Sequence, residues 1–163
     1  MGFGLPAAIG AKIGQPDRTV VCISGDGGFQ MNMQELATAI TNHANIIICI
    51  FNNQYLGMVR QMQQMFYGKR YEITCLRRRK ECPRNCKGPN EACPPYTPDF
   101  MKIAESYGAY GRRITKADEI KDALLKAKGH TDAPTILEFL ISSDEIVLPM
   151  VKSGNPMSEM ILK

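Results

Sequence analysis

Short apolar runs alternate with amphipathic segments along this chain. Three runs are apolar on both faces and rich in β-branched residues, so each predicts a buried strand: 19–24 (TVVCIS), 46–51 (IIICIF) and 135–141 (TILEFLI). Periodic apolar positions predict helices over residues 1–14, 31–43, 58–67, 97–108 and 116–128. This alternation predicts an α/β fold of three layers, in which a mainly parallel sheet carries helices on both faces.

Capping residues mark the ends of two of the predicted helices. Thr97 followed by Pro98 is typical of a helix N-terminus, and Gly108 is typical of the end of the same helix. Thr115, with Asp118 three residues later, predicts a capping box at the start of the next helix.

The length and composition indicate one globular domain over residues 1–163, with 44% apolar residues and no internal repeat. The apolar run 46–51 is far too short to span a bilayer, and no cationic start with a cleavage site indicates a signal peptide. We therefore expect a cytoplasmic protein without membrane contact. The net charge of +4 is too small to predict nucleic-acid binding.

The excess of positively charged residues is concentrated in residues 75–96, which we call the Cys-rich segment. It holds four of the six cysteines and four of the ten prolines, a composition that cannot continue a helix or a central strand. We therefore interpret it as a loop inserted into the α/β domain. Its basic run 77–80 (RRRK) favours a solvated surface over a binding site for an acidic partner.

Four cysteines in the Cys-rich segment have a spacing that could serve a metal. Cys75, Cys82, Cys86 and Cys93 are separated by six, three and six residues. Four thiolates could close a structural Zn²⁺ site or hold an iron–sulfur cluster. The alternative, to which we give equal weight, is a surface loop of reduced or disulfide-bonded cysteines.

Polar residues follow two neighbouring predicted strands. Asp26 lies in the turn 25–28 (GDGG) after the first strand, and Asn52 and Asn53 follow the second. Ligands of parallel α/β sheets bind beyond the carboxyl ends of the strands. Glycines allow backbone N–H groups to approach a phosphate, while carboxylate and amide oxygens are suited to Mg²⁺. Together the motifs predict a metal-bridged diphosphate, although each one alone is more typical of an ordinary turn or helix cap.

The pair of motifs, separated by 24 residues, resembles the thiamine diphosphate and Mg²⁺ signature of thiamine-dependent enzymes. The resemblance extends to the C-terminal thiamine diphosphate-binding domain of the acetolactate synthase large subunit. It is carried, in this order, by MGFGLPAAIGA, GDGGFQMNMQELATAI, NNQYLGMVRQMQQMFYGKRY, TPDFMKIAESYGA and VLPMV. The Cys-rich segment lies outside it.

The resemblance implies a metal site and a cofactor site. Mg²⁺ would be held by the side chains of Asp26 and Asn53 and by the main-chain oxygen of Tyr55. Met62 stands where the family usually has a tryptophan that shapes the pocket for the acceptor substrate, so Met62 is the predicted substrate-pocket residue. The implied cofactor-binding residues are Met1, Gly25, Asp26, Gly27, Gly28, Asn53, Tyr55, Gly57 and Met58.

Within that cofactor set, the resemblance assigns different tasks. Gly27 and Gly28 would offer backbone N–H groups to the diphosphate. Met1 would support the cofactor in its bent shape, and Gly57 and Met58 would lie over it.

The implied reaction is decarboxylation of pyruvate and its condensation with a second 2-oxo acid, a step of branched-chain amino acid biosynthesis. The resemblance implies no catalytic residue in this chain, because the family glutamate lies in the pyrimidine-binding domain of a partner subunit. That domain and the middle domain, which carries FAD, have no counterpart here. Since Met1 begins inside a family motif, we expect a cut-out domain or one product of a split gene, inactive alone and homodimeric.

Two alternatives stay open from the sequence. One is a different thiamine-dependent 2-oxo acid decarboxylase or ligase. The other is a non-catalytic module that dimerises or binds metal through the Cys-rich segment.

Overall fold

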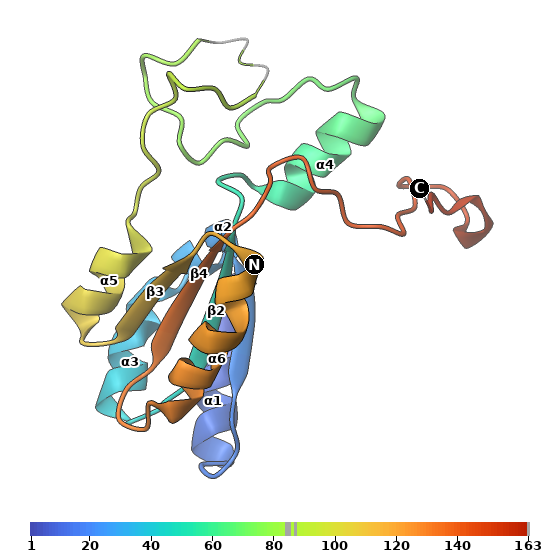
Figure 1. Cartoon of the computed structure of the whole chain (residues 1–163). Coiled ribbons are helices and arrows are strands. Elements are labelled where there is room, and N and C mark those ends of the chain that lie inside the picture. Colours follow the sequence, from blue (N-terminus) through green and yellow to red (C-terminus); the bar gives the residue numbers. More distant parts are fainter. Residues whose placement is uncertain (84–85, 87, 163) are drawn as a thin grey trace.

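Four parallel strands form one sheet in the order β1-β2-β4-β3 (Figure 1). The strands are β1 (Val21–Gly25), β2 (Ile47–Asn52), β3 (Tyr110–Ile114) and β4 (Thr135–Leu140). This computed structural model describes residues 1–83, 86 and 88–162. No helix in that part of the chain combines the length and the apolar character needed to cross a membrane.

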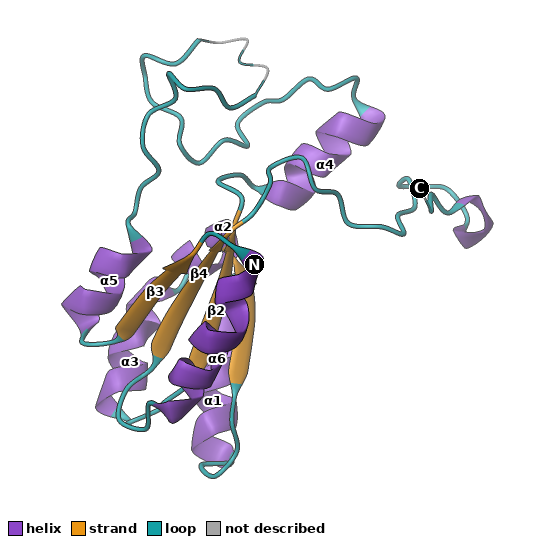
Figure 2. Cartoon of the chain, viewed as in Figure 1, coloured by secondary structure: helices purple, strands orange, loops and turns teal. Residues whose placement is uncertain are grey.

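Helices cover both faces of the sheet, as Figure 2 shows, which confirms the predicted three-layer α/β fold. One face packs against four helices: α1 (Gly4–Gly14), α2 (Asp26–Gln30), α3 (Leu36–Thr41) and α5 (Phe100–Tyr107). The other face packs against α6 (Ile120–Gly129).

Alternation along the strands divides the core between the two faces. Ile48 and Ile50 of β2 face α1, α3 and α5, where the rings of Phe29 and Phe100 meet edge to face with centroids 5.5 Å apart. Their neighbour Cys49 belongs to the smaller core beneath α6. That helix leaves β1 uncovered, so the side chain of Ile23 is 71% exposed.

Helix α4 (Gly57–Phe66) lies beyond the carboxyl ends of the strands and is joined to the C-terminal segment (Figure 1). Arg60 donates a hydrogen bond to the Asp144 carboxylate at 2.8 Å. Gln61 donates to the carbonyl of Val147 and accepts from its N–H group, both at 2.8 Å. These bonds fasten the chain after β4 over the same end of the sheet as α4.

The predicted helix over residues 31–43 is interrupted in the structure. Helix α2 already begins at Asp26, a 3₁₀ turn follows over Met33–Glu35, and α3 begins at Leu36. Asn32 causes the break, because it leaves the helical conformation and its side chain donates to the carbonyl of Gly2 at 2.6 Å. That bond holds the N-terminal segment against the turn after β1.

The predicted helix end at Gly108 is correct, whereas both N-terminal capping predictions identified the right region but the wrong residue. Helix α5 is capped by Asp99, whose carboxylate accepts from the N–H of Met101 at 3.1 Å, and not by Thr97. Before α6, Glu119 instead of Asp118 reaches back and accepts from the N–H of Thr115 at 3.0 Å. A 3₁₀ turn over Ala117–Glu119 precedes that helix.

Strand β3 was not predicted from the sequence. Its sequence, YGRRI, contains a glycine and two arginines and lacks the apolar pattern of a buried strand. It pairs with β4 alone at the edge of the sheet, and edge strands tolerate charged side chains because one side is open to solvent.

Candidate functional site

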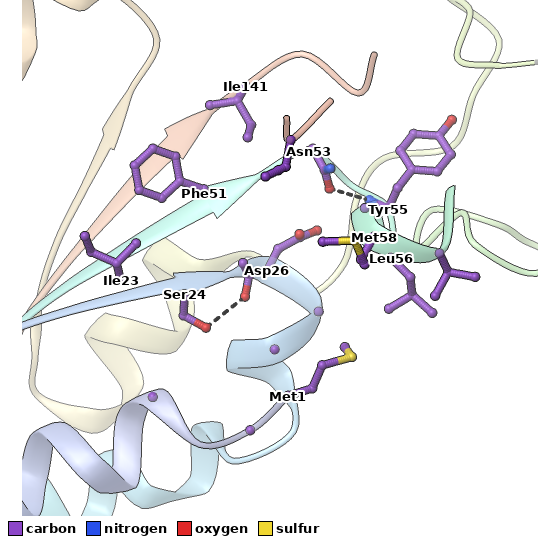
Figure 3. A pocket seen from close by; sticks show the side chains of 18 of the residues that line it. Met1, Ile23, Ser24, Asp26, Phe51, Asn53, Tyr55, Leu56, Met58 and Ile141 are labelled. Atoms are coloured by element: carbon purple, nitrogen blue, oxygen red, sulfur yellow. Dashed lines mark hydrogen bonds between the residues drawn. The ribbon is translucent and has the colours of Figure 1, made fainter. Parts of the chain in front are cut away.

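A cavity of about 520 Å³ opens at the carboxyl ends of β1 and β2 (Figure 3). Its volume suits a small organic ligand or a cofactor. All of the residues predicted to bind the cofactor line it: Met1, Gly25, Asp26, Gly27, Gly28, Asn53, Tyr55, Gly57 and Met58. Apolar side chains complete the wall: Ile23, Phe51, Leu56, Val59, Ile141 and Val147.

The carboxylate of Asp26 is buried, and one of its two oxygens has no hydrogen-bond partner among the described residues. Asp26 is 2% exposed, and the oxygen without a described partner is Oδ2. Burial raises the pKa of Asp26 to about 6, while the Tyr96 hydroxyl and the N–H groups of Gly27 and Gln54 lower it. A carboxylate in this position is stabilised by a proton or by a cation entering from the cavity.

The two asparagines after β2 take opposite directions. Asn52 is buried, donates to Glu138 Oε1 at 2.6 Å and accepts from the N–H of Gln54 at 3.0 Å. Asn53 lines the cavity, and its Oδ1 atom accepts from the N–H of Tyr55 at 3.0 Å. In Figure 3 the carboxyl of Asp26 and the amide of Asn53 point into the same part of the cavity.

Two glycines bring the backbone close to this space. A Cβ atom on Gly27 would lie 2.9 Å from Cδ2 of Leu56, and one on Gly57 would lie 2.7 Å from Nδ2 of Asn53. Neither position accommodates a side chain without movement of a neighbour. The glycines therefore keep the main chain, with its polar groups, at the cavity wall.

The two methionines of the cofactor prediction flank the cavity opening, and both are largely exposed. Met62 is half-buried on α4 and does not belong to the lining of this cavity. Its proposed contact with an acceptor substrate stays a prediction.

The cysteines of the Cys-rich segment do not gather at one point. Cys75 and Cys86 line a small pocket beside Tyr55, which Cys82 and Cys93 do not reach. Among the described residues, no group of three or more His, Cys, Asp or Glu side chains could hold a metal ion. All four thiols are free, so the geometry gives the zinc or iron–sulfur prediction no support and it stays a prediction.

Several residues around the cavity were not predicted from the sequence. Ile23 and Phe51 could have been found, because strand alternation places them on the face opposite to Cys22 and Ile50. Tyr96 could not, since it ends a segment without periodicity and accepts its hydrogen bond from Gln30, at 2.6 Å, only in the folded chain.

The sequence matches a family of known proteins and several of their curated relatives. The sequence family described as thiamine pyrophosphate enzyme, C-terminal TPP binding domain, matches residues 1–139. The probable acetolactate synthase large subunit of Methanococcus aeolicus is 45% identical over 161 residues, which cover 99% of this chain and 24% of that protein. The acetolactate synthase isozyme 2 large subunit of Escherichia coli K12 is 41% identical, over 100% of this chain and 26% of that protein.

A solved structure shares the fold as well. The thiamine diphosphate-dependent 4-hydroxybenzoylformate decarboxylase of Rhodococcus jostii RHA1 superimposes with a TM-score of 0.68 and 29% identity. The alignment covers 90% of this chain and 24% of that one.

Fold and relatives together define the class as the thiamine pyrophosphate enzymes. Within that class, the chain belongs to the family of C-terminal TPP-binding domains, and the resemblance to acetolactate synthase large subunits is confirmed. The chain spans about a quarter of the length of these curated relatives.

Proposed function

We propose that this chain is the diphosphate- and Mg²⁺-binding domain of a thiamine diphosphate-dependent acetolactate synthase. One observation carries the proposal. Asp26 is buried at the end of β1 with an oxygen that no described residue satisfies, and it shares a cavity with the Asn53 amide that follows β2. Mg²⁺ prefers such hard oxygen ligands and keeps phosphate oxygens and water in its remaining positions.

In this proposal the ligands of Mg²⁺ are the Asp26 carboxylate, Oδ1 of Asn53 and the main-chain oxygen of Tyr55. The Asn53 amide is already oriented by the bond that it accepts from the Tyr55 N–H at 3.0 Å. The N–H groups of Gly27 and Gly28 bind the diphosphate, and the absence of side chains there supports this role.

The remaining wall of the cavity orients the organic part of the cofactor. Met1 would contact that part from one side, and Gly57 and Met58 would lie over it. When bound, thiamine diphosphate supplies the chemistry that decarboxylates pyruvate and joins the product to a second 2-oxo acid. The apolar side chains of Leu56, Val59 and their neighbours in the lining exclude water from that site.

We further propose that catalysis requires a pyrimidine-binding domain, with its proton-relay glutamate, from a partner subunit. The chain would then dimerise and be inactive alone, and FAD would bind only through a separate domain. Exposed apolar side chains around the cavity support such contacts, among them Met1, Phe3, Ile23 and Val147. By the same relationship, we place the enzyme in the cytoplasm and in branched-chain amino acid biosynthesis.

Calorimetry on the 163-residue chain tests the cofactor assignment. Thiamine diphosphate is titrated with and without Mg²⁺ into the unsubstituted chain, Asp26→Ala and the control Asp132→Ala, which removes an exposed carboxylate. We expect metal-dependent binding that is lost in Asp26→Ala and retained in Asp132→Ala. A folded chain that binds no cofactor with Mg²⁺ present contradicts the proposal.

A reconstitution assay tests the reaction. The chain is mixed with the pyrimidine-binding and middle domains of an acetolactate synthase, and the conversion of pyruvate to acetolactate is measured. Acetolactate formed by the mixture, and by neither component alone, is the expected result. Release of carbon dioxide without condensation would favour a simple decarboxylase.

A further inference from the structure

Helix α4 carries a buried cation whose hydrogen-bonding capacity is not fully used. Arg60 is 3% exposed, and its Nη1 atom has no hydrogen-bond partner among the described residues. Only one other buried side-chain nitrogen or oxygen of the described chain shares this state, Oδ2 of Asp26 in the candidate metal site. Leaving a buried polar group unsatisfied is costly, so such a group marks a place where an ion or a water molecule binds.

The contacts of the guanidinium show which part of it is left over. Its Cζ atom lies over the rings of Tyr55 and Tyr71, at 4.5 Å and 4.0 Å from their centroids. On one edge, Nε donates to the carbonyl of Ser143 at 3.1 Å and Nη2 donates to the Asp144 carboxylate at 2.8 Å. Nη1 lies away from that edge, so its acceptor has to come from a different direction.

A small pocket adjoins Arg60 where α4 meets the start of the Cys-rich segment. Tyr55, Tyr71 and Cys75 line it, whereas Ser143 and Asp144 do not, so the pocket lies away from the edge that these two residues occupy. Its volume of about 20 Å³ is enough for one particle of roughly the size of a water molecule.

Positive charge borders this pocket. Arg78 joins Arg60 in the lining, and none of the described lining residues is acidic. Within the described chain Arg78 forms no ion pair, and the carboxylate that balances Arg60, on Asp144, is 71% exposed. The adjacent stretch 82–90 contains no Asp or Glu. A water molecule would satisfy Nη1 and leave the second charge unbalanced, whereas a small anion satisfies both.

We propose that this pocket binds one halide ion, such as chloride, which accepts from Nη1 of Arg60 and is attracted by the guanidinium of Arg78. The small volume selects a monatomic anion, because sulfate and phosphate have five heavy atoms each. The site goes beyond the proposed function, since neither arginine lines the candidate metal site. It would join the Cys-rich segment to α4 through an ion held between them.

Nuclear magnetic resonance of ³⁵Cl tests the site in solution, because bound chloride broadens the signal. Chloride is titrated into the 163-residue chain at constant ionic strength, with sulfate as the balancing anion. The variants are Arg60→Met, Arg78→Gln and the control Arg112→Gln. Arg112 is a matched control, since it also pairs with a carboxylate, Asp122 at 2.6 Å, and lies outside the pocket.

The expected results differ among the variants. Saturable broadening should be abolished in Arg60→Met and unchanged in Arg112→Gln. Arg78→Gln removes one nearby charge and should weaken chloride binding by about fivefold. Circular dichroism checks the folding of Arg60→Met, because that residue packs against two rings. If Arg60→Met does not fold, the exposed position Arg78 and a bromide-soaked crystal decide the question.

In that crystal, anomalous diffraction should place a bromide ion within hydrogen-bonding distance of Nη1 of Arg60. Absence of this peak at saturating bromide would show that water fills the pocket and would overturn the inference. Broadening that persists in folded Arg60→Met, that is unchanged in Arg78→Gln, or that sulfate suppresses, would overturn it as well. No thiamine diphosphate or divalent metal is present in these experiments, so their failure leaves the proposed function intact.

Discussion

Two buried carboxylates lie near the same end of the sheet and differ in how their charge is satisfied. Glu138 on β4 is 1% exposed, and it accepts from Arg113 Nε and Asn52 Nδ2, both at 2.6 Å. Asp26 after β1 is 2% exposed, yet its Oδ2 atom has no partner among the described residues. The charge of Glu138 is compensated within the fold, whereas that of Asp26 requires a group from outside. Two carboxylates of equal burial therefore differ in compensation, and our proposal assigns only Asp26 a role as a metal ligand.

The largest expected effect is on the affinity for the cofactor, which should depend on Asp26 and hardly on Glu138. Asp26→Asn removes the anionic ligand and should weaken Mg²⁺-dependent binding of thiamine diphosphate by at least about a hundredfold. Glu138→Gln should change the same constant by less than about fivefold, because that carboxylate lies outside the cavity. Calorimetry on both variants, with circular dichroism to confirm folding, checks the difference. Equal losses would erase the distinction between the two sites.

The second effect concerns stability without metal. Because the folded pKa of Asp26 is about 6 against an ordinary 3.8, the folded chain holds a proton in this interval that the unfolded chain has released. The contribution of Asp26 to the free energy of unfolding should therefore fall by about 3 kcal/mol as pH rises from about 4 to about 6.

Other acids in the chain behave in the opposite sense. The pKa values of Asp99 and Glu119 are lowered mainly by the backbone N–H groups that they accept from, and that of Asp122 mainly by its hydrogen bond from Arg112, so their stabilisation is lost as pH falls. Urea unfolding of the unsubstituted chain minus that of Asp26→Asn isolates the Asp26 contribution. A difference that stays constant between pH 4 and pH 7 would show that Asp26 is not held in a costly environment.

A smaller effect is expected from the partner of Glu138. Arg113→Gln leaves the buried carboxylate without its cation, and we expect a loss of roughly 1–3 kcal/mol in the free energy of unfolding. The loss is moderated because the guanidinium is 41% exposed and water can partly replace it. Adding Glu138→Gln should recover part of the stability. Urea unfolding that shows no loss in Arg113→Gln would place Glu138 in the same class as Asp26.

The smallest effect on stability is expected at the uncovered face of β1. Ile23→Ser replaces a largely exposed side chain and should change the free energy of unfolding by less than about 0.5 kcal/mol. Self-association, measured by analytical ultracentrifugation, should weaken severalfold because apolar contact area is lost. Unchanged association would show that this face takes no part in dimer formation.

Much of this comparison was visible in the sequence. Strands apolar on both faces predicted the parallel sheet. Their predicted burial is correct for β2 and β4 and wrong for β1, an edge strand on which Val21 and Ile23 are exposed. The polar residues at the strand ends predicted where the cavity opens. Asp26 and Asn53 share that cavity because carboxyl ends of neighbouring parallel strands lie at one edge.

The remaining features depend on contacts between distant segments. Strand β3 lies at the edge of the sheet, where a strand needs little apolar surface and can carry charged residues such as Arg113. Its sequence therefore lacks the apolar pattern by which a strand is predicted. The break at Asn32 depends on its bond to Gly2, which lies 30 residues away. The hydrogen bond from Gln30 to the Tyr96 hydroxyl, which joins residues 66 positions apart, likewise forms only when the Cys-rich segment folds back.

A crystal structure of the chain with thiamine diphosphate and Mn²⁺, with anomalous diffraction from manganese, tests the central claim most directly. We predict one anomalous peak within coordinating distance of the Asp26 carboxylate, Oδ1 of Asn53 and the main-chain oxygen of Tyr55, with the diphosphate beside Gly27 and Gly28. Manganese bound at a different place, with the Asp26 carboxylate left without a cation, would contradict the account.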